Sequence, residues 1–167
     1  RAADHAHAML AAIGRTRPGV VALYKALGAE VDPRPLGETL RKAGWSLALP
    51  AAVAPDAPLV FRAWSPGEPL ANDLSGIASP LATAEEVRPN LVIVPLLAFD
   101  RQGGRLGQGG GHYDRPLEAL RGEPSPPAFI GLAYSGQERT DLPREPHDQP
   151  LDGILTEAGY IGVRKDF

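Results

Sequence analysis

The run Leu91-Val-Ile-Val94 constrains the fold more than any other segment of this sequence. Its four residues are all apolar, with no polar residue alternating between them. A strand that is apolar on both sides must be covered on both sides, as parallel strands in the middle of an α/β sheet are. The run therefore predicts a mainly parallel sheet with a layer of helices on each face.

Further segments support this prediction by alternating between helical and strand-like patterns. Residues 2–13 read as a helix, as do residues 33–43, where Leu36 and Leu40 have helical spacing and Gly44 is placed to end the helix. A short helical turn is expected over residues 83–87, because Thr83 and Glu86 match a capping box. The remaining expected elements are strands at 20–24, 46–50, 59–64, 128–134 and 153–156, and a helix at about 113–121.

The composition excludes several classes of protein. The 167 residues fit one domain, and the absence of cysteine excludes a disulfide framework, a zinc–thiolate site and a cysteine nucleophile. A net charge of −3 argues against nucleic acid as a partner, and no apolar run is long enough to span a membrane. The first residues lack the apolar stretch of a signal peptide, so we expect a cytoplasmic protein that is a monomer.

A glycine-rich segment carries the most chemical information. Six of the 19 glycines fall between Gly103 and Gly111, after the most apolar strand and before a helix. Such a junction lies at the carboxyl edge of the sheet, where backbone amides and the nearby Arg101, Arg105 and Arg115 would suit a phosphate. Neither the Walker nor the dinucleotide glycine pattern is present. The alternative is an ordinary loop whose glycines serve turns.

Residues 95–115 closely resemble the signature of the 5-formyltetrahydrofolate cyclo-ligase family. That signature reads roughly Pro-Gly-x-Ala-Phe-Asp-x-x-Gly-x-Arg-Leu-Gly-x-Gly-x-Gly-Tyr-Tyr-Asp-Arg, and most of its positions match in order. The resemblance continues through the rest of the chain, in the blocks from Tyr24 to Asp32, Phe61 to Trp64 and Gln137 to Asp152. It implies a single domain over residues 1–167 without the family's first helix, which bears a lysine that meets ATP. It also implies a three-layer α/β/α sandwich related to sugar-phosphate isomerases and CoA transferases.

The reaction implied by the resemblance uses ATP and Mg²⁺ to close 5-formyltetrahydrofolate into 5,10-methenyltetrahydrofolate. The formyl oxygen takes the γ-phosphoryl group, the 10-nitrogen of the folate attacks the activated carbon, and phosphate leaves. The substrate supplies the nucleophile, so the protein positions the reactants and stabilises charge. The alternative, from a different class, is a non-catalytic domain of the same fold that binds a folate or a phosphorylated ligand for sensing or interaction.

The resemblance also assigns residues to each part of the site. Arg105 and Tyr113 would be catalytic, and Asp114 and Asp148 would hold Mg²⁺. The ATP site would comprise Arg105, Leu106, Gly107, Gln108, Gly109, Gly110, Gly111, His112 and Tyr113. The folate site would comprise Glu30, Trp64, Phe99, Gln108, Gly109, Gly110, Gly111 and His112.

Each of these residues also has an ordinary structural interpretation. Asp114 could cap the helix that begins there, and Asp148 could form an Asx-turn in its proline-rich loop. Glu30 could be an exposed loop carboxylate, and Trp64 a core aromatic.

The sequence departs from the family pattern at three positions. Leu96 replaces a glycine, Ser79 stands where a glutamate commonly precedes proline, and His112 replaces the first tyrosine of Tyr-Tyr-Asp.

Overall fold

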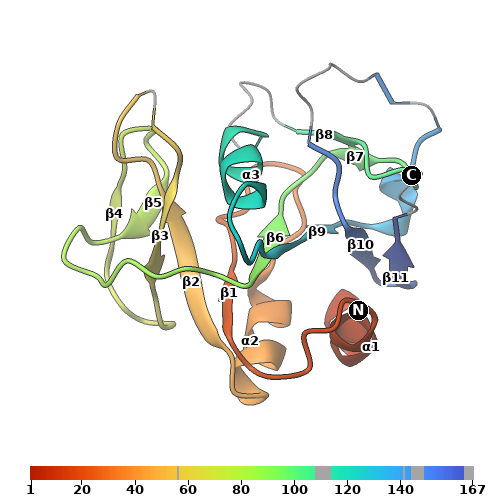
Figure 1. The fold of residues 1–167 in the computed structure, drawn as a ribbon, viewed down its shortest axis with the longest axis horizontal. Helices are drawn as coiled ribbons and strands as arrows, with labels where there is room; N and C mark the ends of the chain where they lie inside the picture. The colour runs from red at the N-terminus through yellow and green to blue at the C-terminus, as the bar shows by residue number, and fades with distance from the viewer. Residues whose placement is uncertain (56, 108–113, 141, 144–148, 164–167) are drawn as a thin grey trace.

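The computed structural model describes residues 1–55, 57–107, 114–140, 142–143 and 149–163, and in it a central sheet runs through the molecule (Figure 1). Within these residues the sheet has seven strands in the order β11-β10-β9-β6-β1-β2-β3. Their bounds are β1 Val20–Ala22, β2 Ser46–Ala51, β3 Val60–Ala63, β6 Leu91–Val94, β9 Ala128–Leu132, β10 Gly153–Thr156 and β11 Gly159–Gly162.

The middle of the sheet is parallel and its two edges are antiparallel. β6 lies in the centre and pairs in parallel with β1 on one side and β9 on the other. β1 and β2 are also parallel, as are β9 and β10. The edge strands β3 and β11 run antiparallel to β2 and β10. The prediction of a mainly parallel sheet is therefore confirmed.

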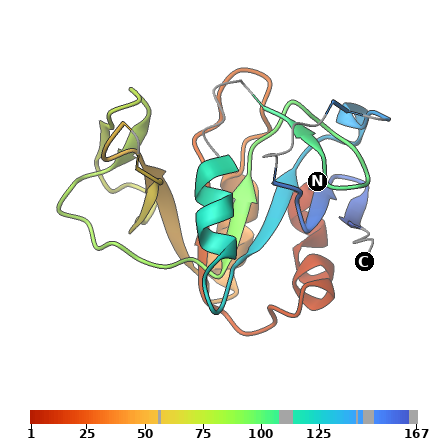
Figure 2. The same ribbon diagram turned by 45° about the horizontal axis from the view of Figure 1, so that its top comes forward.

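Helices cover both faces of the sheet (Figure 2). The short helix η1 (Ala2–His5), α1 (Ala6–Ala12) and α2 (Arg34–Lys42) cover one face, and α3 (Asp114–Arg121) covers the other. Alternate residues of β6 point into the two layers, because Leu91 and Ile93 join one core cluster while Val92 and Val94 join the other. The predicted three-layer α/β/α sandwich is confirmed.

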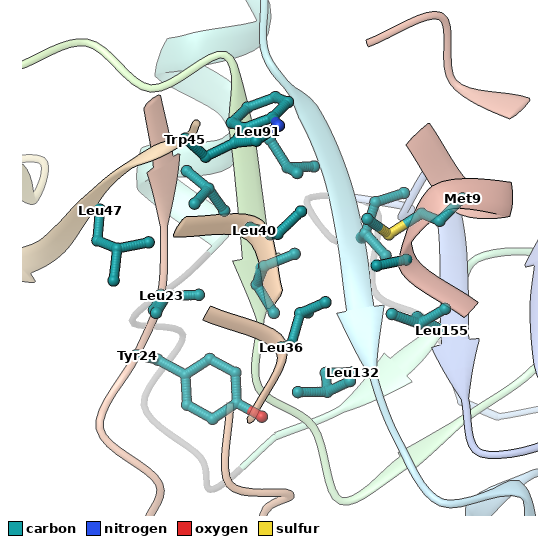
Figure 3. Close-up of a cluster of buried hydrophobic side chains, with 14 of the residues drawn as sticks. Met9, Leu23, Tyr24, Leu36, Leu40, Trp45, Leu47, Leu91, Leu132 and Leu155 are labelled. Carbon is teal, nitrogen blue, oxygen red and sulfur yellow. The ribbon is translucent and has the colours of Figure 1, made fainter. Parts of the chain in front are cut away.

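The larger of the two cores lies under α1 and α2 (Figure 3). Met9 of α1 and Leu36 and Leu40 of α2 pack there against side chains of the sheet such as Leu132 and Leu155, and all five are buried. Burying a side chain of this size stabilises the folded state by about 1.5–3 kcal/mol. The predicted helical spacing of Leu36 and Leu40 is thus the spacing of a core face.

The helix expected at residues 33–43 ends as predicted, whereas the one expected at 83–87 does not form. α2 stops before Gly44, whose φ of 99° is a conformation that favours glycine. Residues 81–84 form a turn instead of a helix, with the amide of Ala84 donating to the carbonyl of Leu81. The next residues pair with the edge of β3, because Glu86 bridges to Arg62 and the amide of Val87 donates to Phe61. Pairing with the sheet edge overrides the capping-box pattern.

Two small hairpins lie outside the main sheet, and the sequence pattern predicted neither of them. One joins β4 (Leu70–Asn72) to β5 (Ala78–Pro80), and the other joins β7 (Ala98–Phe99) to β8 (Arg105–Leu106). The second hairpin follows β6 directly, so it stands at the carboxyl edge of the parallel sheet, at the top of Figure 1.

Candidate active site

The carboxyl ends of β1 and β6 mark the point where the strand order of the sheet reverses. From β1 the chain continues to β2 on one side, and it returns later to β6 on the other side of β1. Loops that leave two neighbouring parallel strands in opposite directions open a crevice between them, which is where α/β sheets bind ligands. The segments that follow β1 and β6 are therefore the first place to look for a site.

The segment after β1 carries Glu30 on a short turn. The carboxylate of Glu30 accepts the amide of Leu27 at 2.9 Å, and the amide of Glu30 donates back to the carbonyl of Leu27 at 3.1 Å. The buried Tyr24 closes the base of this segment by donating from its hydroxyl to the carbonyl of Val31 at 2.5 Å. Glu30 is therefore held in place rather than being a freely exposed loop carboxylate.

The segment after β6 carries Arg105 on a hairpin with a very tight turn. The turn runs from Asp100 to Gly104, and the side chain of Asp100, which is only 4% exposed, accepts the amides of Gln102 and Gly104 at 3.0 and 2.8 Å. Asp100 itself was not among the predicted site residues. Its signal in the sequence is the spacing Asp-x-x-Gly, which is typical of an Asx-turn followed by a glycine with positive φ.

Glu30 and Arg105 lie close enough to interact electrostatically. Burial raises the pKa of Glu30, and the Leu27 amide and the positive charge of Arg105 act in the opposite direction. Both side chains are half-buried. The structure thus brings together a carboxylate from the β1 segment and a guanidinium from the β6 segment at the strand reversal.

Two glycines in the predicted phosphate loop are explained by packing within the protein. Gly103 has a φ of 90°, and a Cβ there would lie 2.8 Å from the carbonyl oxygen of Leu151. A Cβ on Gly104 would lie 2.5 Å from the carboxylate of Asp100. These two glycines are therefore required by packing within the protein. Gly107 follows Leu106, whose side chain is 53% exposed beside Arg105.

Two aromatic residues predicted to wall the folate lie in different surroundings. Phe99 is fully buried in the core cluster beneath α3. The amide of Trp64 donates to the carbonyl of Leu47, near the amino end of β2, so Trp64 lies at the opposite end of the sheet from Glu30. The structure does not bring Trp64 together with the other predicted site residues.

Trp64 instead lines a small hollow at the base of the β4–β5 hairpin. The hollow has a volume of about 210 Å³ and also involves Pro69, Pro80 and Leu81. The indole nitrogen of Trp64 is buried and has no hydrogen-bond partner among the described residues. Part of the ring packs against the larger core, in keeping with the core interpretation of this residue.

Several predicted site residues lie outside what the structure describes. These are Gln108, Gly109, Gly110, Gly111, His112, Tyr113 and Asp148. Asp114 is the first residue of α3, so its backbone stands at the start of that helix, but its side chain lies outside the described part. Among the residues that the structure describes, no three acidic or histidine side chains cluster in a way that could hold a metal ion.

Arg101, grouped with Arg105 by sequence as a phosphate donor, is engaged elsewhere. Its guanidinium pairs with both carboxylate oxygens of Glu138, at 3.0 and 3.2 Å. The pair is exposed and fastens the hairpin to the segment after β9. Arg105 is the arginine whose charge acts on Glu30.

The three residues that depart from the family pattern lie in different parts of the molecule. Leu96 is fully buried and occupies the space beside Gly131 of β9, where a Cβ would lie 2.8 Å from a methyl group of Leu96. Ser79 is buried in the β4–β5 hairpin and donates to the carbonyl of Ala71 at 3.3 Å. His112 lies outside the described residues. Glycine at position 131 therefore makes room for leucine at position 96.

A second set of side chains that sequence reasoning missed lies at the other end of α3. Arg121 donates to the side chain of Gln149 and to the carbonyl of Pro150, and its guanidinium stacks 4.8 Å above the ring of Phe129. Burial lowers the pKa of Arg121. These contacts join α3 to the segment that leads into β10.

Comparison with known proteins gives a consistent result. A sequence model described as the 5-formyltetrahydrofolate cyclo-ligase family matches residues 2–157. The 5-formyltetrahydrofolate cyclo-ligase of Haemophilus influenzae is 34% identical over 141 residues, which cover 81% of this chain and 74% of the relative. That of Mycolicibacterium smegmatis is 31% identical over 159 residues, which cover 90% of this chain and 78% of the relative.

Solved structures show the same likeness. The structure of Aquifex aeolicus 5,10-methenyltetrahydrofolate synthetase matches all of this chain and 84% of its own, with a TM-score of 0.73 and 31% identity. A 5,10-methenyltetrahydrofolate synthetase from Mycoplasma pneumoniae matches 92% of this chain and 83% of its own, with a TM-score of 0.62 and 24% identity, and so supports the fold alone. Within the described residues, no helix is long and apolar enough to cross a lipid bilayer.

Proposed function

This chain belongs to the 5-formyltetrahydrofolate cyclo-ligase family, and from that premise we propose that it uses ATP to cyclise 5-formyltetrahydrofolate to 5,10-methenyltetrahydrofolate. The observation that carries the proposal is that Glu30 and Arg105, one from each segment at the strand reversal of the sheet, lie close enough to interact electrostatically. One group suits the polar end of a folate and the other suits a phosphate. They come from the two segments that an α/β site would use.

The proposed reaction proceeds in two steps that balance without a protein nucleophile. The formyl oxygen of the substrate attacks the γ-phosphorus of ATP, and ADP leaves. The 10-nitrogen of the folate then attacks the activated carbon, and inorganic phosphate leaves with the former formyl oxygen. The task of the protein is to align the two substrates and to stabilise the charge on the phosphoryl group.

In this proposal Arg105 donates to the transferred phosphoryl group. A guanidinium donates to phosphate oxygens through charge-assisted hydrogen bonds, which are stronger than neutral ones. Glu30 hydrogen-bonds the end of the folate that bears the formyl group. Its attachment to the Leu27 amide leaves the carboxylate pre-oriented, which reduces the entropy lost on binding.

The remainder of the ATP and folate sites is proposed from the family pattern. Residues 106–113 would surround the phosphates and border the folate, with Tyr113 beside the reacting groups. Phe99 and Trp64, which the family pattern assigns to the folate, are not proposed as contacts, because Phe99 is fully buried in the core and Trp64 lies at the other end of the sheet. Leu106 offers an exposed apolar side chain next to Arg105 that suits a ring system.

Mg²⁺ belongs to the same proposal. Carboxylate oxygens are the ligands that this hard cation prefers, and Asp114 stands at the start of α3. Asp114 and Asp148 would hold the ion, which would neutralise charge on the ATP phosphates. Exchanging Asp114 for asparagine should lower turnover far more than it lowers the melting temperature. Equal turnover by the variant and its parent would remove Asp114 from the metal site.

We further propose that the protein acts as a cytoplasmic monomer on a small-molecule substrate, without nucleic acid. Sedimentation at micromolar concentration should give a particle of one chain, and a particle of two chains would overturn the proposed monomer.

Turnover tests the main proposal directly. Protein mixed with 5-formyltetrahydrofolate and Mg-ATP should produce the absorbance of 5,10-methenyltetrahydrofolate, and a mixture without ATP should not. If both ligands bind but no product forms, the non-catalytic alternative is correct. If a chain that folds binds neither ligand, both functions are excluded.

A further inference from the structure

We propose that Asp100 is a positioning residue for Arg105, holding the guanidinium where it meets the phosphoryl group; this inference rests on the function proposed above. Asp100 has no place among the expected ligand contacts. It is 4% exposed and faces the turn of the β7–β8 hairpin rather than the crevice.

Four hydrogen bonds tie Asp100 to its own turn. Its carboxylate accepts the amides of Gln102 and Gly104, its backbone amide donates to the carbonyl of Gly104, and its carbonyl accepts the amide of Gly103. The carboxylate bonds are charge-assisted and, being buried, little weakened by solvent. Arg105 is the residue that follows this turn. Its backbone position is therefore set by Asp100.

The hairpin cannot hold this geometry by strand pairing alone. β7 and β8 have two residues each, with Phe99 opposite Arg105 and Ala98 opposite Leu106. An isolated two-stranded ribbon is marginally stable at best, even when it is longer than this. The buried carboxylate supplies the missing constraint at the end nearest to Arg105.

The other side of the hairpin is already fixed, which leaves the turn as the point that decides where Arg105 lies. The carbonyl of Phe99 accepts the amide of Arg139 at 2.7 Å, and the ring of Phe99 is in the core. The carbonyl of Gly103 accepts the amide of Leu151 at 2.9 Å. β7 is thus anchored through Phe99 and the turn through Gly103, and β8 is joined to them by the hydrogen bonds of Asp100 and by its short ladder.

A matched turn elsewhere in the chain provides a control. Asp73, in the β4–β5 hairpin, accepts the amides of Ser75 and Ile77 through its carboxylate, at the same two spacings as Asp100. Its carboxylate also accepts the amide of Ala52 at 2.9 Å, so Asp73→Ala removes at least as many hydrogen bonds as Asp100→Ala. That turn is followed by Ala78 and lies in a different sheet. Loss of Asp73 should therefore destabilise a hairpin without affecting Arg105.

A double-mutant cycle on kcat/KM tests the inference. We expect Arg105→Ala to lower kcat/KM about 100-fold or more, and Asp100→Ala to lower it on the order of 10-fold. If Asp100 acts through Arg105, the double variant should be within about twofold of Arg105→Ala alone, because the two losses are not additive. Asp73→Ala combined with Arg105→Ala should instead give the product of the two separate effects.

Two further readouts separate positioning from a general loss of folding. Asp100→Asn retains an oxygen acceptor for the two amides, and we expect it to restore kcat/KM to within about threefold of the parent. The loss in Asp100→Ala should fall on kcat and on the KM for ATP, with little change in the KM for the folate. Where Asp100→Ala does not fold, Asp100→Ser takes its place in the double-mutant cycle. The serine hydroxyl is a shorter and weaker acceptor than the carboxylate.

The outcomes are distinct from those that decide the function. If the parent protein does not turn over, the proposed function fails before the cycle begins. If the parent is active and the losses of Asp100 and Arg105 multiply in the double variant, Asp100 does not act through Arg105 and this inference is overturned. Equal losses from Asp100→Ala and Asp73→Ala would overturn it as well.

Discussion

Two turns in this protein share the hydrogen bonds within the turn but differ in what surrounds them. Asp73 and Asp100 each accept the amides two and four residues later, and each pairs its backbone with the residue four positions on. The carboxylate of Asp73 also accepts the amide of Ala52, just beyond β2, at 2.9 Å. Each turn has a glycine with positive φ at its fourth position, Gly76 at 76° and Gly103 at 90°. Local sequence of the form Asp-x-x-Gly is enough to build this turn twice.

The two turns differ in what lies around them. A Cβ on Gly76 would meet nothing within 4 Å, whereas one on Gly103 would collide with the backbone of Leu151. Asp73 is half-buried, on a hairpin outside the main sheet, whereas Asp100 is almost fully buried. The same local device therefore closes a hairpin in one place and places a charged side chain in the other. Burial, not turn type, distinguishes the two.

The largest expected effect concerns the arginines of the buried turn. Arg105→Ala should lower kcat/KM by about 100- to 1000-fold, as loss of one transition-state donor commonly does. Arg101→Ala, in the same turn, should change it by no more than about twofold, because an exposed ion pair with Glu138 contributes little. Steady-state kinetics on both variants measure this. Similar losses from the two would mean that the turn as a whole, and not Arg105, faces the substrates.

Substitution of the positive-φ glycine should affect the free energy of unfolding differently in the two turns. Gly103→Ala should lower the free energy of unfolding by about 2–3 kcal/mol, from backbone strain together with collision against Leu151. Gly76→Ala should cost only the strain, about 1 kcal/mol. Urea unfolding of both variants gives the comparison. Equal losses of unfolding free energy would show that the backbone of Leu151 moves to accommodate the added methyl group.

A smaller effect is expected at Glu30, whose turn also has a matched counterpart. Glu68 accepts the amide of Ser65 as Glu30 accepts that of Leu27, but its side chain is exposed. Burial raises the pKa of Glu30, so its contribution to stability is present at low pH and is lost as pH rises through the folded-state pKa. Glu30→Gln should therefore melt slightly higher than the parent at pH 7, by about 1–2 °C, while losing activity.

The pH dependence supplies the control for that prediction. Below about pH 4 the carboxyl of Glu30 is protonated in both folded and unfolded chains, so the gain in melting temperature from Glu30→Gln should vanish. Glu68→Gln should leave the melting temperature close to that of the parent at both pH values. A gain that persists unchanged at low pH would assign the effect to something other than the buried charge.

Much of the fold could be predicted from the sequence, because a continuous apolar strand such as Leu91–Val94 must be covered on both faces. The position of Trp64 could not be predicted from the sequence. Had β3 run parallel to β2, Trp64 would have reached the carboxyl edge, but its antiparallel pairing puts Trp64 at the other end. The four residues of β3 do not indicate the direction of the strand, since a parallel and an antiparallel strand would bury the same side chains.

The candidate site was predicted in its residue types but not in its support. Arg105 and Glu30 stood out because they match the family pattern, whereas Asp100 and Tyr24 act through buried hydrogen bonds to the backbone. Such bonds depend on where distant segments come to lie. The hairpin strands β4, β5, β7 and β8 were missed because runs of two or three residues carry no usable periodicity.

Hydrogen exchange with and without Mg-ATP tests the central claim that the buried turn, and not its counterpart at Asp73, belongs to the site. Addition of Mg-ATP should slow amide exchange in residues 98–107 and leave residues 70–80 unchanged. Equal protection of both hairpins, or protection of residues 70–80 alone, would contradict the assignment of the site to the β7–β8 hairpin.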